Sequence, residues 1–206
     1  MYNKKEYFEG VEFLKKKDTV IKCIFDVNGI IDFKPNPNLF ECLAKIIISQ
    51  QLSNKAANTI TSRVLKLIIK FEPENFLKEK KEDILRCGVS NSKFKFIEGI
   101  SNSITKKELQ LENLRNLEDD EIMTELLKIN GIGEWSASVF MIFGLGKLNV
   151  FPKKDVGLKN AILKFYSLKE IDLDKEIGKI LTLWEGYKTI PCLHLWSAYD
   201  KKIVLN

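Results

Sequence analysis

The sequence is poor in several residues on which common protein chemistries depend. Its 206 residues include one histidine, His194, and four cysteines, none of which forms a CxxC pair. These shortages argue against a zinc or iron–sulfur site built from local ligands and against a histidine-centred catalytic triad. Only five prolines and eleven glycines occur, which favours helices over a turn-rich β fold. The sequence therefore predicts reduced and mostly buried thiols, a partly buried and hydrogen-bonded His194, and a mostly helical chain.

Long apolar stretches are also absent. No run approaches the roughly 20 apolar residues that a membrane helix needs, and the first residues lead into no apolar segment of a secretion signal. We therefore expect neither a membrane protein nor a secreted one. The formal charge of +5, from 33 Lys and Arg against 28 Asp and Glu, permits a polyanionic partner but does not demand one.

Hydrophobic spacing and capping residues predict helices along almost the whole chain. No segment shows the sustained alternation of a strand, so the expected fold class is all-α. The expected helix N-caps are short polar residues, namely Asp18, Asn38, Ser53 and Ser90. The expected helix stops are the two glycines that follow Asn28 and Cys87.

A glycine-containing turn joins two of the predicted helices. One helix ends at Lys128–Ile129, the turn spans Asn130–Gly133, and the next helix begins at Glu134. The two glycines allow unusual torsions, Ile132 can fold under the turn, and amides at a helix N-terminus can bind an anion. Two interpretations stay open at this point. The segment is either a helix–hairpin–helix that grips a DNA phosphate or an ordinary pair of helices with a glycine turn.

A single aspartate follows this turn at a short distance. Asp155 comes after a proline and two lysines and begins a helix whose apolar positions include Leu158 and Ile162. It is either a simple N-cap or a carboxylate that faces a cleft.

Together these segments resemble a known family. Residues 48–57, ISQQLSNKAA, residues 131–137, GIGEWSA, and Asp155, 20 residues after Trp135, occur in the order typical of the helix–hairpin–helix-GPD DNA glycosylase superfamily. The chain is most similar to its 3-methyladenine DNA glycosylase II branch, over roughly residues 35–200. Residues 184–189, WEGYKT, depart from that branch because Gly186 and Lys188 replace a proline and an arginine. A lysine cannot reproduce the bidentate fork of an arginine.

The resemblance implies a fold and a set of site residues. It implies two helical subdomains flanking a DNA-binding and active-site cleft, the first comprising residues 35–150 with the hairpin, and the second comprising residues 1–34 and 151–206. The implied catalytic residue is Asp155. The implied base pocket comprises Trp135, Trp184 and Val139. The implied phosphate-binding residues are Gly131, Ile132, Gly133 and Ser136, and the implied intercalating loop is Gln50, Gln51 and Leu52. The backbone carbonyls of Leu127, Ile129 and Ile132 match the family positions that hold a structural Na⁺ or K⁺.

The resemblance also implies an activity. Trp135 stands where bifunctional relatives carry a nucleophilic lysine, so we expect a monofunctional enzyme without AP lyase activity. The expected reaction is hydrolysis of the N-glycosidic bond of alkylated purines, such as 3-methyladenine and 7-methylguanine, in base excision repair. Two alternatives remain: a monofunctional glycosylase for deaminated or other modified bases, and a non-catalytic DNA-binding protein. We expect a monomer that binds damaged double-stranded DNA, needs no cofactor for chemistry and holds no iron–sulfur cluster. It would be cytoplasmic and nucleoid-associated in a prokaryote and nuclear in a eukaryote.

Overall fold

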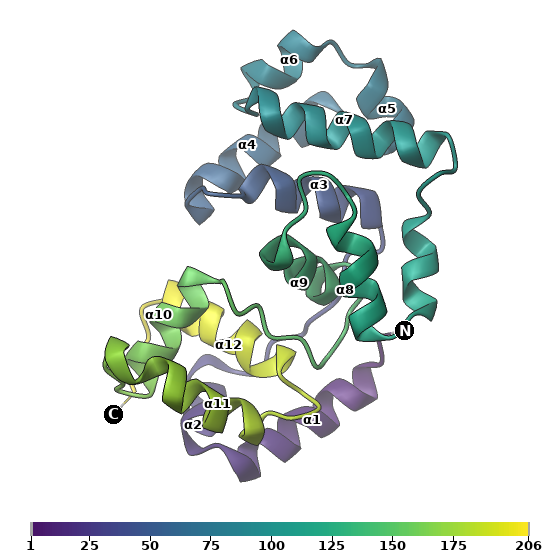
Figure 1. Ribbon diagram of the computed structural model, residues 1–206. Helices are drawn as coiled ribbons and strands as arrows, with labels where there is room; N and C mark the ends of the chain where they lie inside the picture. Colours follow the sequence, from purple (N-terminus) through teal and green to yellow (C-terminus); the bar gives the residue numbers. More distant parts are fainter. Residues whose placement is uncertain (1, 206) are drawn as a thin grey trace. The chain divides into compact units, whose positions relative to one another are not determined.

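The chain folds into two helical units. The computed structural model describes residues 2–205, at Asp174 for the backbone alone, and every regular element in that range is a helix, which confirms the all-α fold class (Figure 1). Unit 1 combines Met1–Lys34 with Gly146–Asn206, and unit 2 is Pro35–Leu145. The predicted subdomains met at 34/35 and 150/151, and the structure divides the chain five residues earlier at the second of these junctions. Within residues 2–205, no helix has the length and apolarity to cross a membrane.

Unit 2 is built around one apolar helix. Helix α3 contacts α4, α7 and α9, and eight of its eleven residues are buried. A helix that is apolar on nearly every side is stable only when other helices surround it. The elements of unit 2 are α3 (Leu39–Ser49), α4 (Asn54–Leu67), α5 (Pro73–Lys78), α6 (Lys81–Arg86), α7 (Asn91–Thr105), the 3₁₀ helix η1 (Leu111–Asn116), α8 (Asp119–Leu127) and α9 (Glu134–Phe143).

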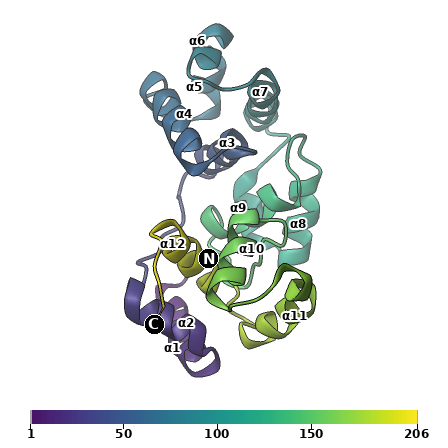
Figure 2. The ribbon, with the colours of Figure 1, turned by 90° about the vertical axis from the view of Figure 1, so that its left-hand side faces the viewer.

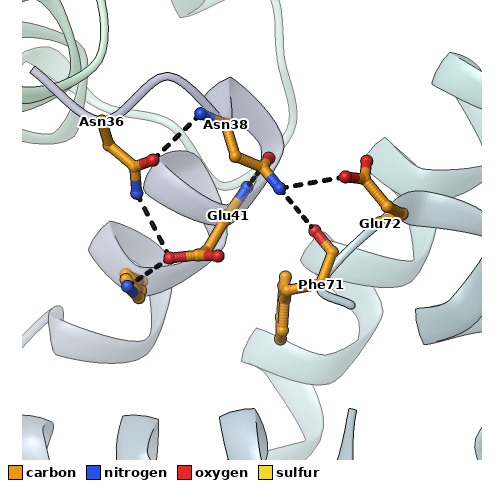
Figure 3. A network of polar contacts seen from close by, with 6 residues as sticks. Asn36, Asn38, Glu41, Phe71 and Glu72 are labelled. Carbon is orange, nitrogen blue, oxygen red and sulfur yellow. Dashed lines mark hydrogen bonds and ion pairs between the residues drawn. The ribbon is translucent and has the colours of Figure 1, made fainter. Parts of the chain in front are cut away.

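A polar network fixes the beginning of α3 (Figure 3). The Asn38 side-chain oxygen accepts a hydrogen bond from the Glu41 amide at 2.9 Å, as an N-cap does. The Asn38 side-chain nitrogen donates to the Phe71 carbonyl at 3.0 Å and to Glu72 at 3.2 Å. Asn36 accepts from the Asn38 amide at 2.9 Å and donates to Glu41 at 3.3 Å. These bonds join the entry of α3 to the segment before α5, so the cap also serves tertiary structure.

The other predicted helix ends are confirmed. Asp18, Ser53 and Ser90 each accept hydrogen bonds from backbone amides in the first turn of the following helix. Gly29 and Gly88, which follow α2 and α6, have φ values of 76° and 105°. Residues with a side chain rarely adopt such left-handed backbone torsions, whereas glycine adopts them without a steric penalty.

Unit 1 is built around the last helix of the chain. Helix α12 packs against α2, α10 and α1 (Figure 2), and eight of its twelve residues are buried. The N-terminal helices therefore depend on a segment that lies more than 150 residues away in the sequence. The elements of unit 1 are α1 (Lys4–Lys17), α2 (Thr19–Asn28), α10 (Val156–Phe165), the 3₁₀ helix η2 (Glu170–Asp172), α11 (Leu173–Leu183) and α12 (Thr189–Asp200).

Candidate functional site

The hairpin between α8 and α9 has the predicted compact turn. Gly131 adopts φ +88°, and the Ile132 amide donates to the Ile129 carbonyl at 3.0 Å. The Ile132 side chain is buried beneath the turn, as the sequence predicted. A Cβ atom at Gly131 would lie 2.4 Å from the ring of Phe96 on α7. Position 131 therefore requires glycine both for its torsion and for the close approach of an aromatic ring.

The start of α9 is exposed at its first residue. Gly133 is the N-cap, it has no side chain to cap the helix, and it lies on the surface. The amides of a first helical turn carry partial positive charge along the helix axis. This end of α9 can therefore accept an anion such as a phosphate.

Ser136 plays an internal role. It is buried, and its Oγ accepts a hydrogen bond from Gln50 Nε2 at 2.8 Å. The same nitrogen donates to the Gly131 carbonyl at 2.9 Å. Ser136 was predicted among the phosphate-binding residues, and this is corrected for its side chain, because its hydroxyl is buried and bound to Gln50.

The loop after α3 presents two of the three side chains predicted to intercalate. Gln51 and Leu52 are exposed, Leu52 at 38%. Gln50 is engaged with the hairpin, so its placement among the intercalating side chains is also corrected. Gln51 adopts φ +57°, a left-handed torsion that costs roughly 1–2 kcal/mol for a residue with a side chain. Such strain persists only where neighbouring contacts impose it.

Lys93, at the start of α7, is one source of those contacts and was not assigned a role from the sequence. Its Nζ donates to the carbonyls of Ile48 and Gln50 at 2.8 and 2.7 Å. Burial lowers the pKa of Lys93. The sequence signal was its position three residues after the Ser90 cap, which places it on the first turn of α7.

Asp155, in unit 1, is an N-cap, as one of the two interpretations of the sequence predicted. It is the N-cap of α10, and its Oδ1 accepts from the Leu158 amide at 2.6 Å. The same oxygen accepts from Trp196 Nε1 on α12 at 3.0 Å. Gly157 lies beside this pair, and a Cβ there would come within 3.3 Å of Oδ1. The carboxylate is partly exposed, so a rigid arrangement of donors presents a negative charge at the surface of unit 1.

A buried thiol lies next to this carboxylate. Cys192 is fully buried and donates to the Lys188 carbonyl at 3.0 Å. Burial and the negative charge of Asp155 raise the pKa of the Cys192 thiol. Cys192 therefore stays protonated and serves packing. Cys42 is also buried, whereas Cys87 is half-buried and Cys23 is exposed, so burial of the cysteines is less general than the sequence predicted.

Lys188 forms a local ion pair. Its Nζ lies 2.6 Å from Glu185 Oε2, and this contact lowers the pKa of Glu185. The residue that replaces the family arginine thus has a carboxylate partner in unit 1.

Two of the residues expected in the base pocket are buried. Trp184 is completely buried in unit 1, next to the rings of Phe151 and Tyr166. Its Nε1 donates to Asp18 Oδ2 at 2.8 Å. A ring without an exposed face cannot stack on a base, so the prediction for Trp184 is corrected to a core role. Val139 is also buried. Trp135 keeps part of its surface exposed and remains the aromatic candidate.

His194 is hydrogen-bonded, as predicted, and it is fully buried where the sequence predicted partial burial. Its Nε2 accepts a hydrogen bond from the Ile31 amide at 3.1 Å, and its Nδ1 lies 2.9 Å from the Ile190 carbonyl oxygen. This arrangement requires the neutral ring with its proton on Nδ1. Burial lowers the pKa of His194 to about 4. The only histidine of the chain is therefore a structural residue of unit 1.

Unit 2 also contains a cavity away from these residues. It has a volume of about 620 Å³ and is bordered by the start of α3, the start of α5 and residues 107–112. None of the predicted site residues lines it. This cavity is therefore separate from the candidate groups that each unit presents.

Comparisons with known proteins identify a family profile and curated relatives. The profile described as "HhH-GPD superfamily base excision DNA repair protein" matches residues 44–186. A Saccharomyces cerevisiae relative named DNA-3-methyladenine glycosylase is 32% identical over 79% of this chain and 58% of its own length. A Bacillus subtilis relative is 28% identical over 88% of this chain and 66% of its own length. The chain thus spans about three-fifths to two-thirds of the length of these relatives.

Two solved structures share the fold. A Bacillus halodurans DNA-3-methyladenine glycosidase gives a TM-score of 0.76 at 31% identity, covering 94% of this chain and 90% of that one. A Schizosaccharomyces pombe 3-methyladenine DNA glycosylase, solved in complex with abasic DNA, gives a TM-score of 0.80 at 24% identity. That match covers 96% of this chain and 98% of the other.

Proposed function

Because the chain belongs to the HhH-GPD superfamily of base excision DNA repair proteins, we propose that it is a monofunctional DNA glycosylase. Its substrates are alkylated purines in double-stranded DNA, and its reaction is hydrolysis of the bond between base and sugar. The names of the yeast and Bacillus halodurans relatives support this substrate class. The observation that carries the proposal is the Asp155 carboxylate, fixed by the Leu158 amide and the Trp196 indole.

The chemistry requires a negative charge near the sugar. Departure of the base leaves positive charge on the sugar ring, and a fixed carboxylate stabilises that charge. Asp155 also orients or deprotonates the water that attacks C1′. Its donors are already in place, so little reorganisation is needed as charge develops. Trp135 has no amine, and a covalent amine intermediate with subsequent strand cleavage is therefore not expected at that position.

The substrate class agrees with the side chains present. A purine methylated at N3 or N7 is cationic and leaves without a strong general acid. An aromatic face attracts such a base through stacking and a cation–π interaction of roughly 0.5–2 kcal/mol. In this proposal Trp135 provides that face, and the exposed Gln51 and Leu52 fill the gap left when the base leaves the stack.

The hairpin would bind the DNA backbone. Gly131, Ile132 and Gly133 supply main chain and amides to a phosphate without reading sequence. The carbonyl oxygens of Leu127, Ile129 and Ile132 are uncharged oxygen ligands of the type that suits Na⁺ or K⁺. Ile129 O accepts from the Ile132 amide and keeps a second lone pair for a cation. A bound cation would add positive charge beside the phosphate, and Asp155 would still perform the chemistry.

The partner and the compartment follow from the substrate. We propose that the protein acts as a monomer on double-stranded DNA. It would work in the nucleoid-containing cytoplasm of a prokaryote or in the nucleus of a eukaryote.

Base release from methylated duplex DNA tests the proposal. Wild type should release 3-methyladenine or 7-methylguanine, Asp155→Asn should release neither at a comparable rate, and no strand should be cut. Asp26→Asn, which removes an exposed carboxylate of the same unit, is the matched control and should behave as wild type. Release of only uracil or hypoxanthine would favour a deaminated-base glycosylase, and DNA binding without any release would favour a non-catalytic protein.

A further inference from the structure

The end of α3 leaves no terminal carbonyl of its last turn without a donor. Three of these carbonyls accept from the backbone amides of Gln50 and Leu52, which follow the helix. The remaining one, Ile48 O, accepts from Lys93 Nζ at 2.8 Å. Helix C-termini commonly bind lysine side chains in this way. Here, however, the lysine comes from a different helix, α7, and therefore joins two elements of unit 2.

The same ammonium group also holds the loop itself. Lys93 Nζ donates to Gln50 O at 2.7 Å, the carbonyl of the peptide that links Gln50 to the strained Gln51. One side chain thus bonds to the last turn of the helix and to the first peptide of the loop. Because both acceptors are fixed in space, the direction in which the chain leaves α3 is fixed as well.

The Gln50 side chain extends this contact to the hairpin. Its single amide nitrogen carries two hydrogens, and they are directed to Gly131 O at 2.9 Å and to Ser136 Oγ at 2.8 Å. The backbone of Gln50 is therefore bound to α7, and its side chain is bound to both sides of the hairpin turn. The chain of contacts runs from Lys93 through Gln50 to Gly131.

We propose that Lys93 and Gln50 are positioning residues, and that they hold the Gln51–Leu52 tip at a fixed distance from the phosphate-binding hairpin. This inference rests on the proposed function, because it assigns the tip to the gap in the duplex. The hairpin sets the register of the DNA backbone, and the tip must enter the stack beside the flipped nucleotide. Because the hairpin and the Gln51–Leu52 tip are already linked, binding of a phosphate by the hairpin directs the tip toward the base stack.

The link predicts a selective defect. Lys93→Met keeps the length of the side chain but loses its donors, so the tip becomes loose while the hairpin stays intact. Misplacement of a positioned group by about 1 Å costs on the order of 100-fold in rate. We therefore expect single-turnover base release to fall about 10- to 100-fold, with affinity for undamaged duplex DNA within about threefold of wild type. Lys93→Arg, which retains donors, should recover most of the rate.

A direct readout of the tip does not need catalysis. A 2-aminopurine placed next to a tetrahydrofuran abasic-site analogue becomes fluorescent when the tip unstacks it. Wild type and Lys93→Arg should raise this fluorescence, and Lys93→Met should not. Lys95→Met is the matched control, since Lys95 is an exposed lysine two residues further along α7 and its loss changes the net charge equally. Lys95→Met should give the wild-type signal.

A double-mutant cycle provides a second test, independent of the Lys95→Met comparison. Gln50→Leu removes the bonds to the hairpin, and its effect on fluorescence should combine non-additively with that of Lys93→Met because both act on one loop. A Lys93→Met protein with the wild-type fluorescence signal and rate overturns the inference, as does equal loss of undamaged-duplex binding and base release. If wild type unstacks 2-aminopurine but excises no alkylated purine, the proposed function fails and the positioning role stands.

Discussion

Trp196 and Asp155 are joined by a hydrogen bond of 3.0 Å from the indole Nε1 to the carboxylate Oδ1. The oxygen that accepts this bond also accepts the Leu158 amide at 2.6 Å. The indole comes from α12 and the amide from α10, so packing between these two helices determines where the carboxylate lies. The helix–helix contact of unit 1 is thereby coupled to the proposed chemistry.

Replacement of Trp196 should slow the reaction more than it weakens the fold. Trp196→Phe keeps an aromatic ring but loses the donor, and a hydrogen bond to a charged group contributes roughly 1.5–3 kcal/mol. We expect a decrease of about 10- to 100-fold in single-turnover base release, as this energy implies. The rate should be measured alongside the thermal midpoint of unfolding. An unchanged rate in a folded Trp196→Phe protein would contradict the positioning of Asp155 by the indole.

The two glycines of the hairpin should respond differently to alanine. At Gly131 an alanine would have to adopt a positive φ, and its methyl group would lie 2.4 Å from the Phe96 ring. Gly131→Ala should therefore lower the free energy of unfolding by about 1–3 kcal/mol. At Gly133 the φ is −103° and no atom lies within 4 Å of the added methyl. Gly133→Ala should therefore cost less in urea denaturation, at most about 1 kcal/mol for an alanine at an N-cap.

DNA affinity distinguishes the roles of the same two variants. If the main chain at Gly133 approaches a phosphate, Gly133→Ala should weaken binding of duplex DNA in a filter-binding titration even though the protein is stable. Wild-type affinity for this variant would show that the phosphate does not approach there. Gly131→Ala should be compared only at temperatures where it is folded.

His194 makes the stability of the protein depend on pH in a definite direction. Its folded pKa is about 4 against an ordinary value of 6.5, so the unfolded chain takes up the proton first as pH falls. The stabilisation is complete above about pH 6.5 and is lost progressively toward pH 4, by about 3 kcal/mol in total. Urea unfolding at pH 7, 6 and 5 should show this decrease.

A histidine-free variant is the control for that titration. His194→Gln should flatten the dependence between pH 6.5 and 5, because the chain has no other histidine. Below this window, stability should fall in both proteins as carboxylates with lowered pKa, such as Asp32 and Glu170, become protonated. A slope above pH 5 that is the same in both proteins would assign the effect to other groups.

Replacement of Trp184 should lower the stability of the fold, whereas replacement of Trp135 should impair base release. Trp184→Phe removes the donor at 2.8 Å from buried Asp18, and an incompletely satisfied buried group costs about 1–3 kcal/mol. Its defect should be seen in the free energy of unfolding, with base release per folded molecule near wild type. Trp135→Leu should instead raise KM or lower kcat for alkylated DNA with little effect on unfolding. The reverse pattern would restore Trp184 to the base pocket.

Local signals in the sequence predicted the helix ends well. Asp18, Asn38, Ser53 and Ser90 act as caps because the amides that they bind lie two or three residues further along the chain. The turn at Gly131 and the burial of Ile132 were predictable for the same reason. Each of these features depends on the torsions and donors of a few neighbouring residues.

Long-range contacts were the part that the sequence could not provide. Trp196 reaches Asp155 across 41 positions, and Lys93 reaches Gln50 across 43. A tryptophan at the end of a helix gives the same sequence signal whether it stacks on a ligand or fills a core, which explains the error at Trp184. Ser136 was misplaced similarly, because only the tertiary structure shows that Gln50 takes its hydroxyl.

The order of the two units along the chain has a genetic consequence. Unit 2 is one uninterrupted stretch of the sequence, whereas unit 1 is formed by two segments that flank it and centres on α12. A nonsense or frameshift mutation between the codons for residues 160 and 189 leaves the hairpin and Asp155 in the product. It nevertheless removes the indole that holds the carboxylate and the helix on which α1 and α2 pack. Late truncating alleles should therefore behave as null alleles.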